Sequence, residues 1–380
     1  MRILFCGQSR YPNNSDASTN RYIAIAKTMA FENEIIFINR IPLLENNYFS
    51  RNIDFKVIDV SNHKFRPKNF IKRFFLKLFA TLFEFRTIRK LNQEKKIDWI
   101  NIYTQYFGLC LFYYFLSKIF NFKTIFHYVE IRSEFKNRNI FYKLNDFLCD
   151  NYVMFLFDRY IPISHCINQQ IKVKNKKAKT LVIPPICDFN YFKTLNCATT
   201  VEDAYFLYCG SAHYTEVIVF IIESFKKIED KKGIKLYLVL SGEITTQLKK
   251  LIEKDEDKII IFSRLDYEKL ICFYKNALAL LIPLRNTKQD EARFPQKIGE
   301  YVASNKIIIS TNYGEVKYYF KDMDNALIAN DYDVVLYKEK MQWVILNRSK
   351  TKKLEDNAFE SGRKNFDIAS YYNPVKIFMT

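Results

Sequence analysis

The chain has 380 residues, of which 59 are Lys or Arg and 41 are Asp or Glu, giving a formal net charge of +18. At roughly 150 residues per domain this length predicts about two domains, each large enough to bury its own core. Hydrophobic residues make up 49% and charged residues 26% of the chain, which excludes a disordered tail and a fibrous protein. An excess of lysine is by itself weak evidence for an anionic partner.

The eight cysteines stand singly, with no Cys-x-x-Cys spacing and no clustering near the four histidines. This pattern argues against a disulfide scaffold and a structural zinc site and favours a reducing compartment. The N-terminal apolar run ends too early for a signal peptide, and the apolar stretch at residues 106–116 is too short to span a bilayer. We therefore expect a soluble cytoplasmic protein with basic surfaces.

In the N-terminal part of the chain, short apolar runs alternate with helical patterns. Strands are predicted at residues 2–6, 35–39, 55–60, 99–103 and 124–129, and helices at 20–30, at 108–120 and in a long basic region after residue 60. Continuous apolar strands separated by helices are typical of a parallel sheet covered on both faces. We expect a Rossmann-like domain over residues 1–190.

A second series of the same kind begins near residue 204. Strands are predicted at 204–209, 234–240, 259–262, 279–283 and 307–310, and helices at 216–228, 245–253, 267–275, 295–304 and 315–319. A lysine run and two prolines interrupt the pattern before it and place a linker at about 188–202. We expect a second Rossmann-like domain at 200–361, with residues 362–380 packing back on the first.

The predicted fold class is α/β, with two doubly wound domains facing across a cleft. Open parallel sheets bind ligands at the carboxyl ends of their strands. The function is therefore expected in that cleft.

The most informative segment is DEARFPQKIGEYVASNKIIISTNYGE, which predicts a loop, a helix and a strand. Pro295 suits the first helical turn because it lacks an N–H that would have no partner there. Gln296 and Lys297 would then aim free amides and an ammonium at an anion in front of the helix. Glu300 shares their face and can accept two hydrogen bonds from a ribose diol. Asn305 is expected to end the helix in the left-handed conformation. The alternative is an ordinary helix whose N-terminal lysine binds no ligand and whose Glu300 is solvated.

The run FPQKIGEYVASNKIIIST resembles the nucleotide-sugar motif of retaining glycosyltransferases of the family 4 type, the group 1 glycosyltransferases, which have the two-domain GT-B fold. In the same order, RILFCGQSRYPNNSDASTNRYIAIAKTM resembles their first strand, acceptor-side loop and first helix. FLYCGSAHYTEVIVFIIESFKKI resembles the start of their donor domain. The resemblance implies a hexosyltransferase that moves a sugar from a nucleotide diphosphate sugar to a cell-surface polysaccharide or lipid-linked glycan, with retention of configuration.

The same resemblance implies the residues of the site. Donor-binding candidates are Gly210, Ser211, Ser263, Arg264, Arg285, Arg293, Phe294, Pro295, Gln296, Lys297 and Glu300. Candidate catalytic residues are Lys297, Glu291, His127 and Glu130, and the acceptor is expected at Asn14, Ser18 and Arg21. For His127 and Glu130 the alternative is a strand-end histidine and a solvated glutamate.

The sequence departs from the family pattern at two places. The first of two family glutamates would fall at Ala292, so either Glu291 replaces it or the chain belongs to a subgroup with Phe-Pro-x-Lys instead. The family's Arg and Lys after the first donor-domain strand are missing from this sequence. Lys297, Arg285 and Arg293 are the nearest replacements in sequence, and without a replacement catalysis would be weak or absent.

No cofactor and no obligatory metal are expected. Asp-x-Asp pairs occur at 255/257, 322/324 and 331/333, but they lie in lysine-rich or turn segments without the buried strand that normally precedes a diphosphate metal site. A departing phosphate oxygen can take the acceptor's proton, so the resemblance requires no separate acid and base pair.

Residues 60–83 contain six Lys or Arg and no acid, with apolar residues at helical spacing opposite the charges. Such a helix predicts either contact with an anionic membrane surface, which would make the protein peripheral on the inner face of the cell membrane, or a core-facing helix with a solvated basic face. Two other functions remain open. One is a nucleotide-sugar epimerase or hydrolase of the same fold, and the other is a basic nucleic-acid-binding protein, although no reading motif accompanies the charge.

Overall fold

The computed structural model describes residues 1–8, 11–12, 17–40, 54–61, 69–134, 138–197, 203–263 and 265–380. They divide into two compact units, the first formed by Met1–Pro184 with Tyr371–Thr380 and the second by Pro185–Ser370. These boundaries differ from the expected linker at 188–202 and from the expected return at 362. The reason is that α6 (Phe189–Thr194) and α14 (Arg348–Phe366) both pack against α11 (Lys297–Ala303) inside the second unit.

The first unit is built on a seven-stranded sheet in the order β3-β2-β1-β4-β5-β6-β7, with parallel pairing throughout. The strands are β1 (Arg2–Gly7), β2 (Glu34–Asn39), β3 (Lys56–Asp59), β4 (Trp99–Tyr103), β5 (Lys123–Tyr128), β6 (Arg159–Pro162) and β7 (Lys179–Thr180). Most residues of the central strands are buried because helices cover both faces of the sheet. The five strands expected from sequence are confirmed; β6 and β7 are short and each begins with a basic residue, so no apolar run marked them.

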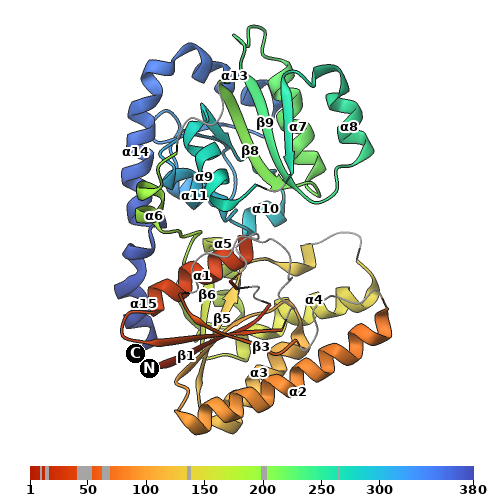
Figure 1. Ribbon diagram of the computed structural model, residues 1–380, viewed down its shortest axis with the longest axis vertical. Coiled ribbons are helices and arrows are strands. Elements are labelled where there is room, and N and C mark those ends of the chain that lie inside the picture. The colour runs from red at the N-terminus through yellow and green to blue at the C-terminus, as the bar shows by residue number, and fades with distance from the viewer. Residues whose placement is uncertain are drawn as a thin grey trace. The chain divides into compact units, whose positions relative to one another are not determined.

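Helices lie on both faces of this sheet (Figure 1). One face carries α1 (Ala17–Met29), against which α15 (Tyr372–Met379) packs. The other carries α2 (Phe70–Glu94), α3 (Phe107–Phe120), α4 (Ile140–Tyr152) and α5 (His165–Lys174). This division follows from right-handed crossovers. From β1 to β2 the chain moves in one direction along the sheet, which places α1 on one face. From β3 to β7 it moves in the opposite direction, which places the later helices on the other face. The helices α2, α3 and α4 therefore form one layer.

The second unit has a six-stranded parallel sheet in the order β10-β9-β8-β11-β12-β13. The strands are β8 (Tyr205–Ser211), β9 (Lys235–Ser241), β10 (Ile259–Ser263), β11 (Ala279–Leu281), β12 (Ile308–Thr311) and β13 (Leu327–Ala329). Its helices include α7 (Thr215–Lys226), α8 (Thr246–Ile252), α9 (Tyr267–Asn276), α10 (Lys288–Ala292), α12 (Val316–Tyr319) and α13 (Val334–Leu346). The α/β fold class predicted from the sequence is confirmed.

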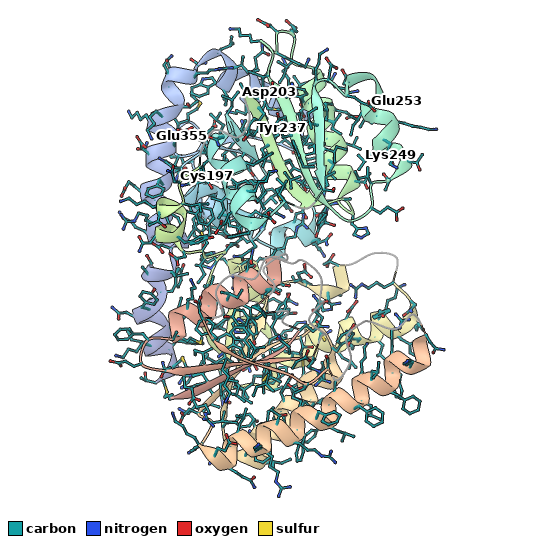
Figure 2. The ribbon with its side chains drawn as sticks, in the orientation of Figure 1. Cys197, Asp203, Tyr237, Lys249, Glu253 and Glu355 are labelled. Carbon is teal, nitrogen blue, oxygen red and sulfur yellow. A yellow bond between two sulfur atoms is a disulfide. The ribbon has the colours of Figure 1, made fainter. Side chains whose placement is uncertain are left out.

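The structure contains one disulfide that the spacing of the cysteines did not predict. Cys197, just after α6, and Cys272, in α9, form a disulfide, whereas the other six cysteines are free (Figure 2). The two positions are 75 residues apart in sequence, so only the packing of α6 near α9 brings them together. The bond links two elements of the second unit and does not make a disulfide scaffold.

Among the described residues, no helix is long and apolar enough to cross a membrane.

Candidate functional site

The sheet of the second unit changes direction between β8 and β11. From β8 the chain moves to β9 on one side, and from β11 it moves to β12 on the other. Ligands of doubly wound sheets bind at such a switch point, outside the carboxyl ends of the strands. Here β8 ends with Gly210 and Ser211 and leads into the turn before α7, and β11 leads into the segment before β12, which contains α10 and α11.

A fully buried carboxylate organises the segment after β11. Asp290 accepts hydrogen bonds from the backbone N–H of Arg285 at 2.8 Å and from the Nε of the same guanidinium at 3.0 Å. Its other oxygen lies 3.1 Å from a terminal nitrogen of Arg285 and 2.9 Å from the Nε of Arg293. One aspartate thus fixes two arginines, and the hydrogen bonds that the Arg285 side chain donates to Asp290 raise the pKa of Arg285 above its ordinary value.

Both arginines also reach the start of α7, which follows β8. Arg285 forms an ion pair with Glu216 at 2.8 Å, and the Arg293 guanidinium lies 4.4 Å from the ring centroid of Tyr214. Asp290 was not singled out from sequence. Its spacing of three residues from Arg293 could have indicated the ion pair, because side chains at that spacing lie close together on a helix.

The helix α11 starts at Lys297, so Pro295 precedes it and does not open it as expected. Gln296 occupies the N-cap with helical backbone angles and without a side-chain cap. Its amide nitrogen donates to the carbonyl of Ile186 at 3.1 Å, so the side chain is engaged within the unit. The expected left-handed ending is confirmed, because Asn305 has a φ of 53°.

Lys297 is half-buried close to the end of β8. Burial raises the pKa of the Cys209 thiol at that strand end, and the positive charge of Lys297 opposes the rise. The backbone N–H of Cys209 donates to the Tyr301 hydroxyl at 3.1 Å, which joins β8 to α11. Glu300 is buried on the same helix and accepts a hydrogen bond from the Tyr267 hydroxyl at 3.0 Å.

The remaining donor-side candidates are spread over the unit. Phe294 is buried and stacks on Tyr319 with ring centroids 5.3 Å apart, which makes it part of the core. Ser263 ends β10 and is exposed, whereas Arg264 lies outside the described residues.

Glu291 is half-buried on α10, next to Asp290. Gly314, with a φ of +58°, packs so closely there that a Cβ would stand 2.7 Å from the Asp290 carbonyl oxygen. The turn after β12 is thereby fixed against α10.

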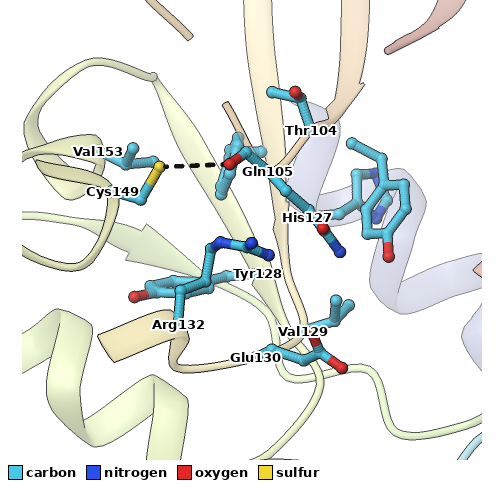
Figure 3. A pocket seen from close by; sticks show the side chains of 11 residues that line it. Thr104, Gln105, His127, Tyr128, Val129, Glu130, Arg132, Cys149 and Val153 are labelled. Carbon is cyan, nitrogen blue, oxygen red and sulfur yellow. Dashed lines mark hydrogen bonds between the residues drawn. The ribbon is translucent and has the colours of Figure 1, made fainter. Parts of the chain in front are cut away.

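In the first unit, His127 lies in a small pocket at the carboxyl ends of β4 and β5 (Figure 3). Its Nε2 is 3.0 Å from the Asn101 Oδ1, and its Nδ1 has no hydrogen-bond partner among the described residues. Burial, with a smaller contribution from the charge of Arg21, lowers the pKa of His127 well below its usual value, so the ring is neutral at pH 7. The pocket offers only about 20 Å³ to water, which is too little for a sugar ring.

The other first-unit candidates differ in exposure. Glu130 is half-buried and lines the same pocket as His127. Ser18 is half-buried at the start of α1, and Asn14 lies outside the described residues. Arg21 is buried and donates to the carbonyls of Pro184 and Ile183 at 2.8 and 2.6 Å. Its guanidinium therefore fixes the backbone at the point where the segment Met1–Pro184 of the first unit ends.

Within the ranges that the structure describes, no group of three or more His, Cys, Asp or Glu side chains could hold a metal ion.

Two parallel doubly wound units, with a cationic segment at the switch point of the second, define the GT-B fold, and similar solved structures agree. A sucrose-phosphate synthase from Thermosynechococcus elongatus is 14% identical with a TM-score of 0.74, and the match covers 99% of this chain and 97% of that one. Anabaena HepE in complex with UDP-glucose is also 14% identical, with a TM-score of 0.69 and coverage of 99% and 98%. A glycosyltransferase from Rickettsia africae is 16% identical, with a TM-score of 0.67 and coverage of 99% and 97%.

Residues 198–361 match the family model described as glycosyl transferases group 1. The matched residues lie within the second unit and make up less than half of the chain. No curated protein matches the sequence.

Proposed function

We propose that this chain transfers a sugar from a nucleotide diphosphate sugar to a cell-surface polysaccharide or lipid-linked glycan, with retention of the anomeric configuration. The observation that carries the proposal is the meeting of three cations around the end of β8. Arg285, Arg293 and Lys297 come from one segment after β11: Arg285 contacts Glu216, Arg293 contacts Tyr214, and the charge of Lys297 acts on the Cys209 thiol. The bound UDP-glucose named for HepE is consistent with a diphosphate donor.

The proposed chemistry needs fixed positive charge where the leaving group becomes an anion. The bond between the anomeric carbon and the donor phosphate oxygen breaks, and the bond to the acceptor oxygen forms on the same face of the sugar. The departing phosphate oxygen takes the acceptor's proton, so neither an obligatory metal nor a cofactor is required. Cations that are already held in place stabilise this transition state without reorganising, and Asp290 holds both arginines in this way.

The other donor residues receive roles that follow from their positions. Glu300, one turn after Lys297, is proposed to bind the ribose diol through its carboxylate, which also accepts from the Tyr267 hydroxyl. Glu291 is proposed to face the donor sugar in place of the family's first glutamate. Gly210 and Ser211 would let the diphosphate approach the backbone after β8.

On the acceptor side we propose that His127 acts as a neutral hydrogen-bonding group through its Nδ1, together with Glu130. Because the pocket beside them is smaller than a sugar, this role requires the pocket to widen when substrate binds. Arg21 is engaged with backbone carbonyls, so contact with the acceptor would fall to Asn14 and Ser18.

The donor can be identified by thermal shift with UDP-, GDP- and CDP-sugars, followed by product analysis with and without acceptor. Retention appears as an unchanged anomeric configuration in the NMR spectrum of the product. An altered or free sugar formed without acceptor would contradict transfer and indicate an epimerase or hydrolase.

The role of Lys297 has a matched control. We expect Lys297→Ala to lower kcat/KM by about 100-fold, as for the loss of one transition-state donor. Lys288→Ala removes the same charge from an exposed position on α10 and should leave kcat/KM unchanged. Equal activity of the two variants would refute the assignment of Lys297.

We also propose that the first unit binds an anionic membrane surface, which fits a lipid-linked acceptor. The supporting feature is the layer formed by α2, α3 and α4, whose outer surface is apolar. Its exposed large side chains include Phe74, Phe75, Leu78, Phe79, Leu82 and Phe83 on α2, Phe115 and Ile119 on α3, and Ile140, Phe141, Leu144 and Phe147 on α4. On α2 the usual pattern is inverted: Glu84 is fully buried and Phe74 is 58% exposed. These exposed apolar side chains do not fit the alternative of a helix whose apolar residues all face the core.

The charges of this layer favour an anionic bilayer. Its exposed charged side chains are Lys72, Lys77, Arg86, Arg89, Lys90, Glu94, Lys118 and Lys143. The layer's other described acids are buried and paired: Glu84 with Arg40, Asp146 with Arg132, and Asp150 with Tyr128. An apolar surface bordered by cations matches the chemistry of a membrane interface.

Sedimentation with phosphatidylglycerol vesicles tests this surface. Replacing Lys72, Lys77 and Arg86 by Gln should weaken binding by about 100-fold, at roughly 1 kcal/mol per charge. Phe75→Ser with Phe79→Ser should abolish binding, whereas Leu346→Ser, exposed on the second unit, should not. Unchanged vesicle binding in the layer variants would contradict the proposal.

A further inference from the structure

The first unit contains a second hollow, on the edge of the sheet opposite to the His127 pocket. It lies where β6 and β7 begin and has a volume of about 530 Å³. Its lining includes Arg159, Lys172, Lys176, Lys177, Lys179 and, from α15, Phe378. Because ligands of open parallel sheets bind at the carboxyl ends, this hollow at the amino ends does not belong to the nucleotide-sugar or acceptor site.

Arg159 is the central feature of the hollow. The residue is only 6% exposed, and its guanidinium lies between two rings, with centroids 4.8 Å away on Trp99 and 5.3 Å away on Phe378. Among the described residues, it forms no hydrogen bond or ion pair. The neighbouring Asp158 instead accepts from the N–H and the hydroxyl of Thr124, at 2.8 and 2.7 Å.

A guanidinium that is almost buried and has no hydrogen-bond partner among the described residues keeps its N–H donors available to an anion in the hollow. A guanidinium has five N–H donors, and burial disfavours its charged form when no anion faces it. Burial lowers the pKa of Arg159, and only the charge of Asp158 opposes that shift. The aromatic rings stabilise the flat faces of the guanidinium but satisfy none of its N–H donors.

The strand pairing adds a second cation beside the first. In the register of β6 and β7, Arg159 pairs with Lys179, so two positive residues are neighbours on adjacent strands. Lys172 donates to the Ala178 carbonyl at 2.6 Å, while Lys176 and Lys177 are exposed at the rim. The described lining contains no Asp or Glu.

We propose that this hollow is an anion-binding site for a phosphate or diphosphate group. Arginine offers a planar pair of donors that matches phosphate oxygens, and lysines supply compact charges around it. Several cations without an acidic side chain in the lining suit a multiply charged group better than a single carboxylate. The phosphate belongs either to a soluble metabolite or to a lipid head group, and the site does not depend on the proposed transferase activity.

Calorimetric titration with inorganic pyrophosphate at low ionic strength tests the site. Pyrophosphate can also occupy the proposed donor site, so the titration is made in Lys297→Ala. We expect this variant to retain a binding event that Lys177→Gln with Lys179→Gln weakens by about tenfold or more. The matched control removes two exposed lysines of α8, Lys249→Gln with Lys250→Gln, and should bind like the parent (Figure 2).

Arg159→Gln should also weaken binding by at least about tenfold, and the lysine variant keeps the test valid if this buried substitution prevents folding. Absence of pyrophosphate binding in Lys297→Ala would overturn the proposal, as would equal affinities of the hollow and α8 variants. The source of the phosphate is decided with phosphatidylglycerol vesicles. If Lys177→Gln with Lys179→Gln weakens vesicle binding, the phosphate belongs to a lipid head group. If vesicle binding is unchanged, the phosphate belongs to a soluble metabolite. Both outcomes support the site once pyrophosphate binding is established.

Discussion

The contacts of Asp290 predict that its carboxylate is the main electrostatic support of the second unit's site. Asp290→Ala leaves Arg285 and Arg293 without the anion that holds them, at side-chain exposures of only 15% and 14%. Removing one member of a buried ion pair costs about 3–5 kcal/mol, and access of water to the arginines places this case at about 3 kcal/mol. The same substitution should lower kcat/KM, because the guanidinium groups lose their fixed positions.

Urea unfolding of the second unit measures the effect. The chain has two tryptophans, Trp99 in the first unit and Trp343 in the second, so Trp99→Phe leaves Trp343 as the reporter. Glu216→Gln is the matched control, because Glu216 pairs with the same Arg285 but its side chain is 70% exposed. Exposed pairs contribute at most about 1 kcal/mol. Equal losses in the two variants, or a loss below about 1 kcal/mol for Asp290→Ala, would refute the reasoning.

Three further predictions concern stability. His127 is buried and neutral with a lowered pKa, so below pH 6.5 only the unfolded chain binds a proton at this residue. The free energy of unfolding should therefore fall by up to about 1.4 kcal/mol per pH unit below pH 6.5. In urea titrations at pH 7 and 5, His127→Gln should remove this contribution to the pH dependence. Gly314→Ala should destabilise the second unit by about 1–3 kcal/mol because of its positive φ and the nearby Asp290 carbonyl, and an unchanged urea midpoint would contradict this. Reducing Cys197–Cys272, which closes 75 residues, should lower the second unit's stability by at most about 4 kcal/mol, whereas alkylation of both thiols without prior reduction would show that the bond is absent.

Local sequence patterns were sufficient to predict most strands of the two sheets. Apolar runs such as β1 and β8 are buried on both faces, so composition and spacing alone mark them as strands. They were insufficient for β6, β7 and β13, which are four, two and three residues long. The short α10 was missed for the same reason: five residues leave no periodicity to detect.

The candidate site was predicted in part. The segment that carries Lys297 and Glu300 was located from sequence, and the structure places both near the end of β8. The spacing of Pro295 and Gln296 could not reveal that Gln296 would turn toward Ile186, because that contact spans 110 residues. Nor could it reveal that Asp290 holds both arginines.

What the sequence determined by itself was the succession of strands and helices, because burial on two faces leaves a local mark in every apolar run. What the tertiary structure alone decided was the partner of each charged side chain and the exposure of each apolar one. Glu84 lies inside while Phe79 lies outside, and Arg159 stacks between rings from distant strand and helix. A residue's type fixes its charge and size, but its free energy depends on neighbours that only the folded chain supplies.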